Sequence, residues 1–234
     1  MLLNDFVKAP NIGHHPDTYE RENEAIARDG RLDAALERLA PIAGKRVLDV
    51  GCGTGFWVQR LAERADLCVG VEPDPMLLER AQERLRETPR GDAVRGSAEH
   101  LPFQNDSFDV IHARFAYFFG EGALPGLEEV RRVLAPGGTF IAVDNDDADS
   151  EFTDLLRAAT GGNADHDLPA TARWWAAQGA MRVPIQVGWA AKTLPELEAI
   201  LRIEFPGDVI DAFLEHHTRT DLTMANALYV VNAS

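Results

Sequence analysis

The chain has 234 residues, of which 45% are hydrophobic and 26% are charged, a composition typical of globular proteins. This length is enough for one α/β domain with a complete hydrophobic core. The sequence has 38 acidic and 23 basic residues, and its formal net charge is therefore -15. An acidic surface repels phosphate backbones and anionic lipids, so neither nucleic acid nor a membrane is an expected partner.

The cysteines and the first residues indicate the compartment. Cys52 and Cys68 are too few for a disulfide framework, and we expect both thiols to be reduced. The opening residues, MLLNDFVKAP, lack the basic-then-apolar pattern of a signal peptide. No apolar run approaches the roughly 20 residues of a membrane helix. These features predict a cytoplasmic protein, either a monomer or a homodimer.

Residues 1–43 predict an N-terminal cap. The first 18 residues contain two prolines and a glycine, and we expect them to be irregular. A helix rich in Glu, Arg, Ala and Leu is predicted to begin near Asp17 and to end at Ala40. Gly30 is expected to divide this helix in two.

From residue 44 onward, short apolar segments alternate with helical patterns. Strands are predicted at residues 46–50, 67–71, 93–95, 108–113 and 139–143, with helices at 56–64, 75–87 and 124–133. A turn is expected at Pro136–Gly138, before the fifth strand. Strands that alternate with helices over short connections predict a parallel sheet covered on both faces.

The pattern loosens after Asp149. Helices are predicted at residues 152–159, 170–178, 194–202 and 208–217, with strands at 184–189 and 227–231. No linker separates this tail from the sheet. We therefore expect residues 44–234 to form one domain with an insertion at residues 151–180.

A glycine loop follows the first predicted strand. Gly51, Gly53 and Gly55 occupy alternate positions, which allows the backbone to turn sharply and to approach a ligand closely. Asp49 precedes the loop, and Glu72 ends the next strand. A carboxylate at that second position can accept hydrogen bonds from ribose hydroxyls.

Four motifs carry a resemblance to a known family. In chain order they are VLDVGCGTG, VGVEPDPMLLERA, GSAEHLPFQNDSFDVIHA and EEVRRVLAPGGTFI. Together they resemble the class I S-adenosylmethionine-dependent methyltransferases, over residues 44–143. The resemblance implies a Rossmann-like, doubly wound α/β fold with an N-terminal helical cap. The expected sheet has seven mostly parallel strands, the last of them antiparallel.

The resemblance also implies a cofactor site for S-adenosylmethionine. The methionine part would lie on Asp49, Gly51, Cys52, Gly53 and Gly55, with Cys52 contributing through its backbone. Glu72 would bind the ribose, Pro73 and Met76 would border the adenine, and Ala98 and Glu99 would read its edge. Glu72 and Glu99 can instead be read as solvated surface acids, and Met76 as a core residue at helical spacing.

Residues 114–119 stand where many relatives with small acceptors carry histidines. In this chain the segment is RFAYFF, which leaves the general base unassigned and predicts an aromatic wall facing the acceptor, although each ring can equally be core. Arg114 is a candidate for binding the cofactor carboxylate or an acidic acceptor, or for a surface ion pair. Asp144 and His15 are the candidate catalytic residues, and Tyr19 is a candidate contact of the cofactor carboxylate.

The Asp-Asn pair at residues 144 and 145 resembles part of the metal site of catechol-type O-methyltransferases. That site also needs an acid where this sequence has Arg114, and a cation beside a metal ion is unfavourable. No metal is therefore predicted.

The predicted function is methyl transfer to an oxygen or nitrogen of a small, partly apolar metabolite. The alternative is a regulatory or interaction protein that binds S-adenosylmethionine without transferring its methyl group. A protein acceptor is also open. An NAD-type oxidoreductase is disfavoured because the glycines follow G-x-G-x-G rather than G-x-G-x-x-G.

Overall fold

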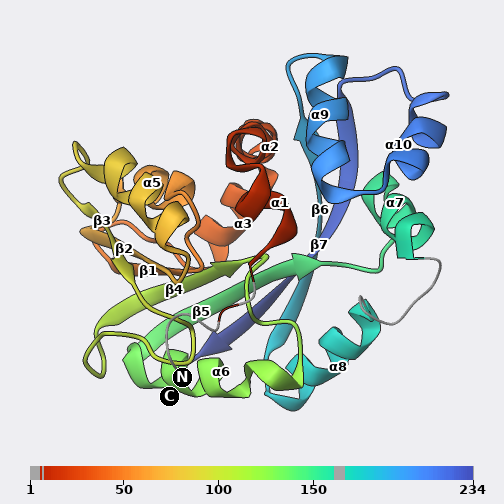
Figure 1. Cartoon of the computed structure of the whole chain (residues 1–234). Helices are drawn as coiled ribbons and strands as arrows, with labels where there is room; N and C mark the ends of the chain where they lie inside the picture. Colours follow the sequence, from red (N-terminus) through yellow and green to blue (C-terminus); the bar gives the residue numbers. More distant parts are fainter. Residues whose placement is uncertain (1–5, 7, 161–166, 234) are drawn as a thin grey trace.

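A computed structural model describes residues 6, 8–160 and 167–233. Its centre is a seven-stranded sheet of order β3-β2-β1-β4-β5-β7-β6 (Figure 1). β1 to β5 are parallel, and β7 is antiparallel to both of its neighbours. The predicted fold class is confirmed. The strands are β1 Arg46–Val50, β2 Leu67–Glu72, β3 Gly91–Arg95, β4 Phe108–Arg114, β5 Leu134–Asn145, β6 Met181–Ala190 and β7 Asp221–Asn232.

Helices cover both faces of the sheet. In Figure 1, α2 to α5 lie above the sheet, and α6 and α8 lie below it. The described helices are α1 Pro10–His14, α2 Pro16–Asp29, α3 Arg31–Leu39, α4 Phe56–Ala62, α5 Pro75–Leu85, the short 3₁₀ helix η1 Glu121–Ala123, α6 Leu124–Val133, α7 Glu151–Thr160, α8 Leu168–Ala177, α9 Leu194–Glu204 and α10 Gly207–Leu214.

The alternation of side chains along each strand produces two hydrophobic cores. Val47 of β1 packs in the core under α2 to α5, whereas its neighbour Leu48 packs in the core over α6 and α8. Ile141 and Phe140 of β5 divide between the two cores in the same way. Successive strand residues point to opposite faces, so a sheet buried on both faces needs the nearly continuous apolar runs that the sequence provides.

The N-terminal region is more helical than expected. The prediction that the first 18 residues are irregular is wrong for α1 and for the first turn of α2. Each helix begins with a proline, which is compatible with the first helical position because the N–H that it lacks has no partner there. The predicted break is confirmed, since Gly30, with a φ of 71°, ends α2 and precedes α3.

The segment Pro136–Gly138 lies within β5 and is not a turn before it. Phe108 of β4 pairs with Leu134, but Val110 pairs with Thr139, so the extra residues of β5 form a bulge. Gly137 has a φ of 73°. The turn-forming residues are therefore accommodated as an irregularity in the pairing of β5 with β4.

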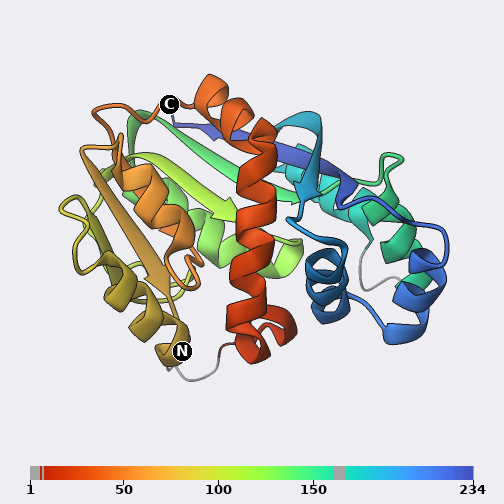
Figure 2. The same ribbon diagram turned by 90° about the horizontal axis from the view of Figure 1, so that it is seen from above.

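The N-terminal helices share the core of the sheet. Ala25 and Ile26 of α2 and Leu32 of α3 belong to the same buried cluster as Trp189 of β6 and Ile200 of α9. Figure 2 shows α2 crossing between α4 and α5 on one side and α9 on the other. This position brings α2 over the sheet edge at which β1, β2 and β4 end.

The close packing of the backbones of β6 and β7 can be tested by a substitution. A Cβ atom added to Gly188 of β6 would lie 2.4 Å from the carbonyl oxygen of Leu222 in β7. We expect Gly188→Ala to lower the free energy of unfolding by about 1–3 kcal/mol, because a backbone oxygen moves only with its strand. Urea unfolding measures this. Gly122→Ala is the matched control, since no atom lies within 4 Å of its added Cβ. Equal stability of the two variants would contradict the packing.

Candidate functional site

A large cavity lies at the carboxyl ends of β1, β2, β4 and β5. Its volume is about 1780 Å³, well above the roughly 300–1,000 Å³ of an ordinary small-ligand pocket. The order of the strands reverses between β1 and β4, and in open α/β sheets ligands bind in the crevice at this point. The cavity therefore has the position and the size for more than one ligand.

The glycine loop forms the floor of the cavity. The φ angles of Gly51, Gly53 and Gly55 are 76°, 55° and 75°, in the left-handed region that glycine adopts without strain. The amides of Gly51 and Cys52 both donate to the carbonyl of Val71, at 2.9 and 3.1 Å, which fastens the loop to β2. A Cβ on Gly51 would lie 2.6 Å from Cβ of Ala116. Only glycine fits at this position.

Backbone amides orient the carboxylate of Glu72 beside this loop. One oxygen accepts from the amide of Gly53 and the other from the amide of Asp74, both at 2.9 Å. Glu72 is only 6% exposed, and burial raises its pKa to about 7 although both hydrogen bonds act to lower it. Each carboxylate oxygen retains a lone pair for a further donor. The carboxylate is thus ready to accept two hydroxyls that lie close together.

Most of the other residues predicted to bind the cofactor also line the cavity. They are Tyr19, Asp49, Pro73, Ala98, Glu99 and Arg114. Glu99 has a hydrogen-bonding partner in Tyr117, and burial followed by the charge of Glu99 raises the pKa of the Tyr117 hydroxyl to about 12.

Two predicted residues are placed away from the cavity wall. Met76 is 36% exposed, and its amide donates to the Asp74 side chain that caps α5. Leu77, the next residue, lines the cavity in its place. Gly55 precedes α4 behind the loop and packs against Ala81 of α5.

Arg114 is a buried cation with unused donors. Its side chain is 5% exposed, and none of its three guanidinium nitrogens has a hydrogen-bond partner among the described residues. The guanidinium lies over the ring of Trp57, 4.0 Å from the centroid, and 3.7 Å from the carboxylate of Asp33. This geometry excludes the alternative of a surface ion pair. Buried guanidinium donors without partners indicate a place for an anionic group.

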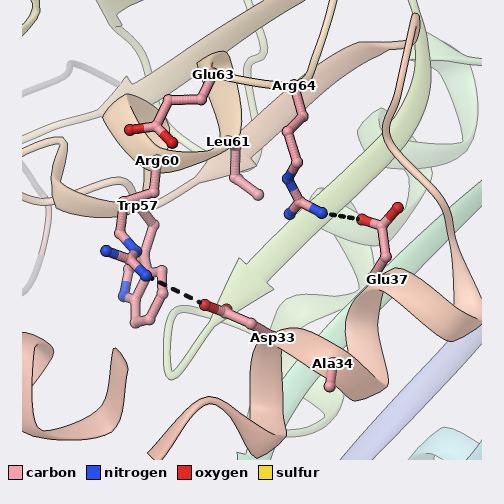
Figure 3. Close-up of a pocket in the computed structure, with 8 residues that line it drawn as sticks. All are labelled: Asp33, Ala34, Glu37, Trp57, Arg60, Leu61, Glu63 and Arg64. Carbon is pink, nitrogen blue, oxygen red and sulfur yellow. Dashed lines mark hydrogen bonds and ion pairs between the residues drawn. The ribbon is translucent and has the colours of Figure 1, made fainter. Parts of the chain in front are cut away.

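Asp33 is a weak partner for Arg114 because it also faces Arg60 of α4, at 3.8 Å. Figure 3 shows this pair beside a second ion pair, between Arg64 and Glu37 at 2.7 Å, in a depression between α3 and α4. Both arginines of this depression are paired with acids of α3. The depression links the cap to the domain and is not a candidate active site.

The comparisons with known proteins agree with this geometry. A family model described as a methyltransferase domain matches residues 47–138. An uncharacterized methyltransferase of Mycobacterium tuberculosis is 38% identical over 135 residues, which are 58% of this chain and 52% of that protein. A demethylmenaquinone methyltransferase of Clavibacter sepedonicus is 34% identical over 126 residues, 53% of this chain and 51% of that protein. The chain spans about half the length of these curated relatives.

Solved structures show the same fold. YcgJ of Bacillus subtilis has a TM-score of 0.58 at 22% identity, covering 86% of this chain and 97% of its own. An S-adenosylmethionine-dependent methyltransferase of Aquifex aeolicus has a TM-score of 0.60 at 13% identity, covering 92% and 98%. Residues 47–138 therefore belong to the methyltransferase domain family, and the chain as a whole has the fold of S-adenosylmethionine-dependent methyltransferases. S-adenosylmethionine is therefore the cofactor against which the site is to be tested.

The residues that line the cavity fit that cofactor. The Glu72 carboxylate matches a ribose diol, the guanidinium of Arg114, whose N–H donors lack hydrogen-bond partners among the described residues, matches a carboxylate, and the glycine loop leaves room that a Cβ would fill. Cys52 fits a backbone role, because its buried side chain points toward Gly70 of β2. Which of these residues touches the cofactor stays a prediction.

Asp144 is the last residue but one of β5, on the far side of the cavity. It is 6% exposed and lines the wall, and its Oδ1 accepts from the amide of Asn145 at 2.7 Å. Burial raises the pKa of Asp144 to about 7. A carboxyl that titrates near neutral pH has the proton affinity suited to a general base.

Among the described residues, no group of three or more His, Cys, Asp or Glu side chains is arranged to hold a metal ion.

The aromatic segment after β4 divides between wall and core. Phe115, Tyr117 and Phe119 line the cavity, whereas Phe118 is 2% exposed and packs against Phe140. Phe115 and Tyr117 have φ angles of 51° and 61°. Left-handed backbone in bulky residues costs roughly 1–3 kcal/mol each and is common near functional sites. Trp174 and Trp175 divide likewise, since Trp174 lines the cavity and Trp175 is fully buried.

The N-terminal helices are fastened to the glycine loop. Glu20 of α2 accepts from the hydroxyl of Thr54 and, at 2.5 Å, from Arg84 of α5. Tyr19, the preceding residue, lines the cavity, whereas His15 is exposed at the start of α2 and is not part of the wall. Among the two predicted catalytic residues, only Asp144 faces the cavity.

Sequence reasoning missed two acids. Glu22 of α2 and Glu204 of α9 both line the cavity. Glu22 lies one helical turn after Tyr19 and so shares its face, which is a signal that the sequence contains. Glu204 has no such signal, because only the packing of α9 against α2 brings it to the cavity.

None of the described helices is both long and apolar enough to cross a membrane.

Buried carboxyls make the stability of this domain dependent on pH. Burial raises the pKa of Asp49 to about 6 and of Asp144 to about 7, so the folded state binds more protons than the unfolded chain between about pH 4 and 7. The free energy of unfolding that these groups contribute therefore falls as the pH rises through that window. We expect Asp144→Asn to remove on the order of 2 kcal/mol of the fall between pH 5 and 8.

Urea unfolding at several pH values measures this effect. Glu87→Gln, at an exposed site, is the control and should keep the slope of the wild type. If Asp144→Asn also keeps that slope, Asp144 is ordinarily ionised and its environment has been misread.

Proposed function

We propose that this protein binds S-adenosylmethionine across the glycine loop and transfers the methyl group to an oxygen or nitrogen of a small, partly apolar acceptor. The observation that carries the proposal is the Glu72 carboxylate, which two backbone amides hold at the wall of a cavity far larger than one ligand needs. A carboxylate in this position, beside a glycine loop, suits a nucleoside ribose.

The two sides of the cavity suit two ligands. Asp49, Glu72, Glu99 and Arg114 supply polar groups near the loop. The lining also contains apolar and aromatic residues from α2, α7, α8, β6, α9 and β7: Ile26, Phe152, Trp174, Trp189, Ile203 and Met224. The first set of residues supports a polar cofactor, and the second supports an acceptor with an apolar body.

The chemistry required of the protein is modest. S-adenosylmethionine supplies a methyl group that is already electrophilic. The chain has to orient the acceptor, exclude water and, where the acceptor must lose a proton, accept that proton. Positioning alone supplies roughly 7–11 kcal/mol in favourable cases. Asp144, buried at the cavity wall, is the candidate to accept the proton, and a base of this kind adds roughly 10²–10⁴-fold.

Several features of this proposal rest on composition alone. The small size of the acceptor, a cytoplasmic location, the absence of a nucleic-acid partner and a monomeric or homodimeric state remain predictions from the sequence. The acidic charge of -15 supports the exclusion of nucleic acid.

Replacing Glu72 tests the cofactor site. Glu72→Gln retains the size of the side chain but replaces one acceptor oxygen with an NH2 donor. That donor would face a backbone amide, from which the native oxygen accepts a hydrogen bond. We expect the Kd of S-adenosylhomocysteine to rise by about 10- to 100-fold, since a hydrogen bond to a charged group contributes roughly 1.5–3 kcal/mol. Isothermal titration calorimetry measures this. Glu87→Gln should bind as the wild type does. Binding of NAD in place of the cofactor would contradict the proposal.

Replacing Asp144 tests the general base. An acceptor is first identified by incubating the protein with radiolabelled S-adenosylmethionine and a metabolite extract, and a labelled small product excludes a protein that only binds. With that acceptor, we expect kcat to rise with pH and to level off above about pH 7, where Asp144 is ionised. Asp144→Asn should lower kcat by roughly 10²–10⁴-fold and flatten this profile. Unchanged kcat would show that another group, or none, accepts the proton.

A further inference from the structure

Two carboxyl groups meet at the wall of the cavity, one from the cap and one from the C-terminal part of the chain. Glu22 lies on α2 and Glu204 is the last residue of α9, and their side chains lie close enough for the two charges to interact. Both line the cavity. Glu22 is 6% exposed, and its buried Oε2 has no hydrogen-bond partner among the described residues.

The groups around the pair are acidic or neutral. Asn11 of α1 donates to Glu204 at 2.7 Å, and this hydrogen bond, like the interaction with Glu22, acts to lower the pKa of Glu204. Tyr19, one turn before Glu22, feels the charges of Glu20, Glu22 and Glu204, which together with burial raise the pKa of its hydroxyl. Among the described residues, no Lys, Arg or His forms an ion pair with either carboxyl.

A pair of this kind holds a proton. Burial raises the pKa of both carboxyls, and the charge of Glu204 raises that of Glu22 further. Two carboxylates this close together repel each other, which favours one proton on the pair and a net charge near minus one. No cationic side chain among the described residues pairs with that charge. Buried charges are ordinarily paired, and the missing partner has to come from outside the described chain.

The surroundings of the pair define what that partner is. Ile26, Ile203 and Trp189 line the same cavity and provide an apolar and aromatic wall. A ligand that satisfies both features has a cationic head and an apolar body. An aliphatic ammonium group donates up to three hydrogen bonds, enough for both carboxyls, and an aromatic face adds a favourable contact for its charge.

We propose that Glu22 and Glu204 form the binding site for the ammonium group of the methyl acceptor, which is therefore an amine with an apolar body. This inference rests on the proposed function and narrows the class of acceptor. The cofactor carries an amino group of the same chemistry. We assign the pair to the acceptor because Glu204 lies on α9, beside the apolar lining formed by α7, β6 and β7.

Calorimetry on the full chain saturated with S-adenosylhomocysteine tests the proposal. Octylamine is the probe, and 1-octanol is its neutral match. We expect octylamine to bind at least 10-fold more tightly than octanol. Glu22→Gln and Glu204→Gln should each remove most of that preference. Glu24→Gln is the matched control on the same helix, because Glu24 pairs with Lys192 outside the cavity. Equal affinities of octylamine and octanol for the wild type would overturn the proposal.

A second measurement needs no variant and remains valid if the substitutions impair folding. Octylamine is cationic at neutral pH, and the pair carries about one negative charge, so the two charges match without a change of protonation. Titrations in buffers of different ionisation enthalpy should therefore show little net proton release. Release of close to one proton for each amine bound would show that the neutral amine binds, and would overturn the proposal.

The source of the ammonium group and the proposed function are tested separately. If the Gln variants weaken S-adenosylhomocysteine but leave octylamine and 5′-methylthioadenosine unchanged, the pair binds the amino group of the cofactor, and the proposal for the acceptor fails. If the wild type does not bind S-adenosylhomocysteine at all, the proposed function fails instead. Intact cofactor binding without amine preference overturns only the role assigned to the acid pair.

Discussion

The tight turn after β1 is the constraint on which the rest of the site depends. Gly51 and Gly53 adopt left-handed backbone, and Gly51 fits between the carbonyl of Val71 and the side chain of Ala116. The same turn presents the amide of Gly53 to the carboxylate of Glu72. A side chain at Gly51 would therefore do more than occupy space, because it would move the amide that orients the carboxylate. Loop, strand end and acid are held as one unit.

This unit operates in a cavity that is rich in carboxyl groups. Acidic side chains outnumber basic ones among the described lining residues, and Asp49, Glu72 and Asp144 are buried. Burying an ionised carboxylate costs free energy, and this cost is the reason that burial raises the pKa values of these groups. A cationic ligand in the cavity would offset the cost by its attraction to the carboxylates. Under the proposed function, a cavity of this charge would favour the sulfonium cofactor over the neutral thioether that remains after methyl transfer.

The sequence predicted the parts of the site that are local. The glycine loop, Asp49 and Glu72 lie at strand ends whose apolar runs and turn residues are legible in a single stretch of chain. The sequence did not correctly place the residues whose position depends on the rotation of a helix or on tertiary packing. Met76 and Leu77 differ by one position on α5, and only the packed helix shows that Leu77 faces the cavity. Glu204 meets Glu22 across 182 positions of chain, through the packing of α9 on α2, which no local pattern records.

The family match covers only some of the residues that line the cavity. The methyltransferase match covers residues 47–138, which supply the glycine loop, Glu72 and Arg114. Asp144 and the Glu22–Glu204 pair lie outside it, on the side of the cavity that α2, β5 and α9 build. The matched segment is about two fifths of the chain and supplies the residues proposed to bind the cofactor, together with the aromatic segment after β4. We expect the remaining specificity for the acceptor to come from the part of the chain without that match, where the Glu22–Glu204 pair lies beside an apolar wall.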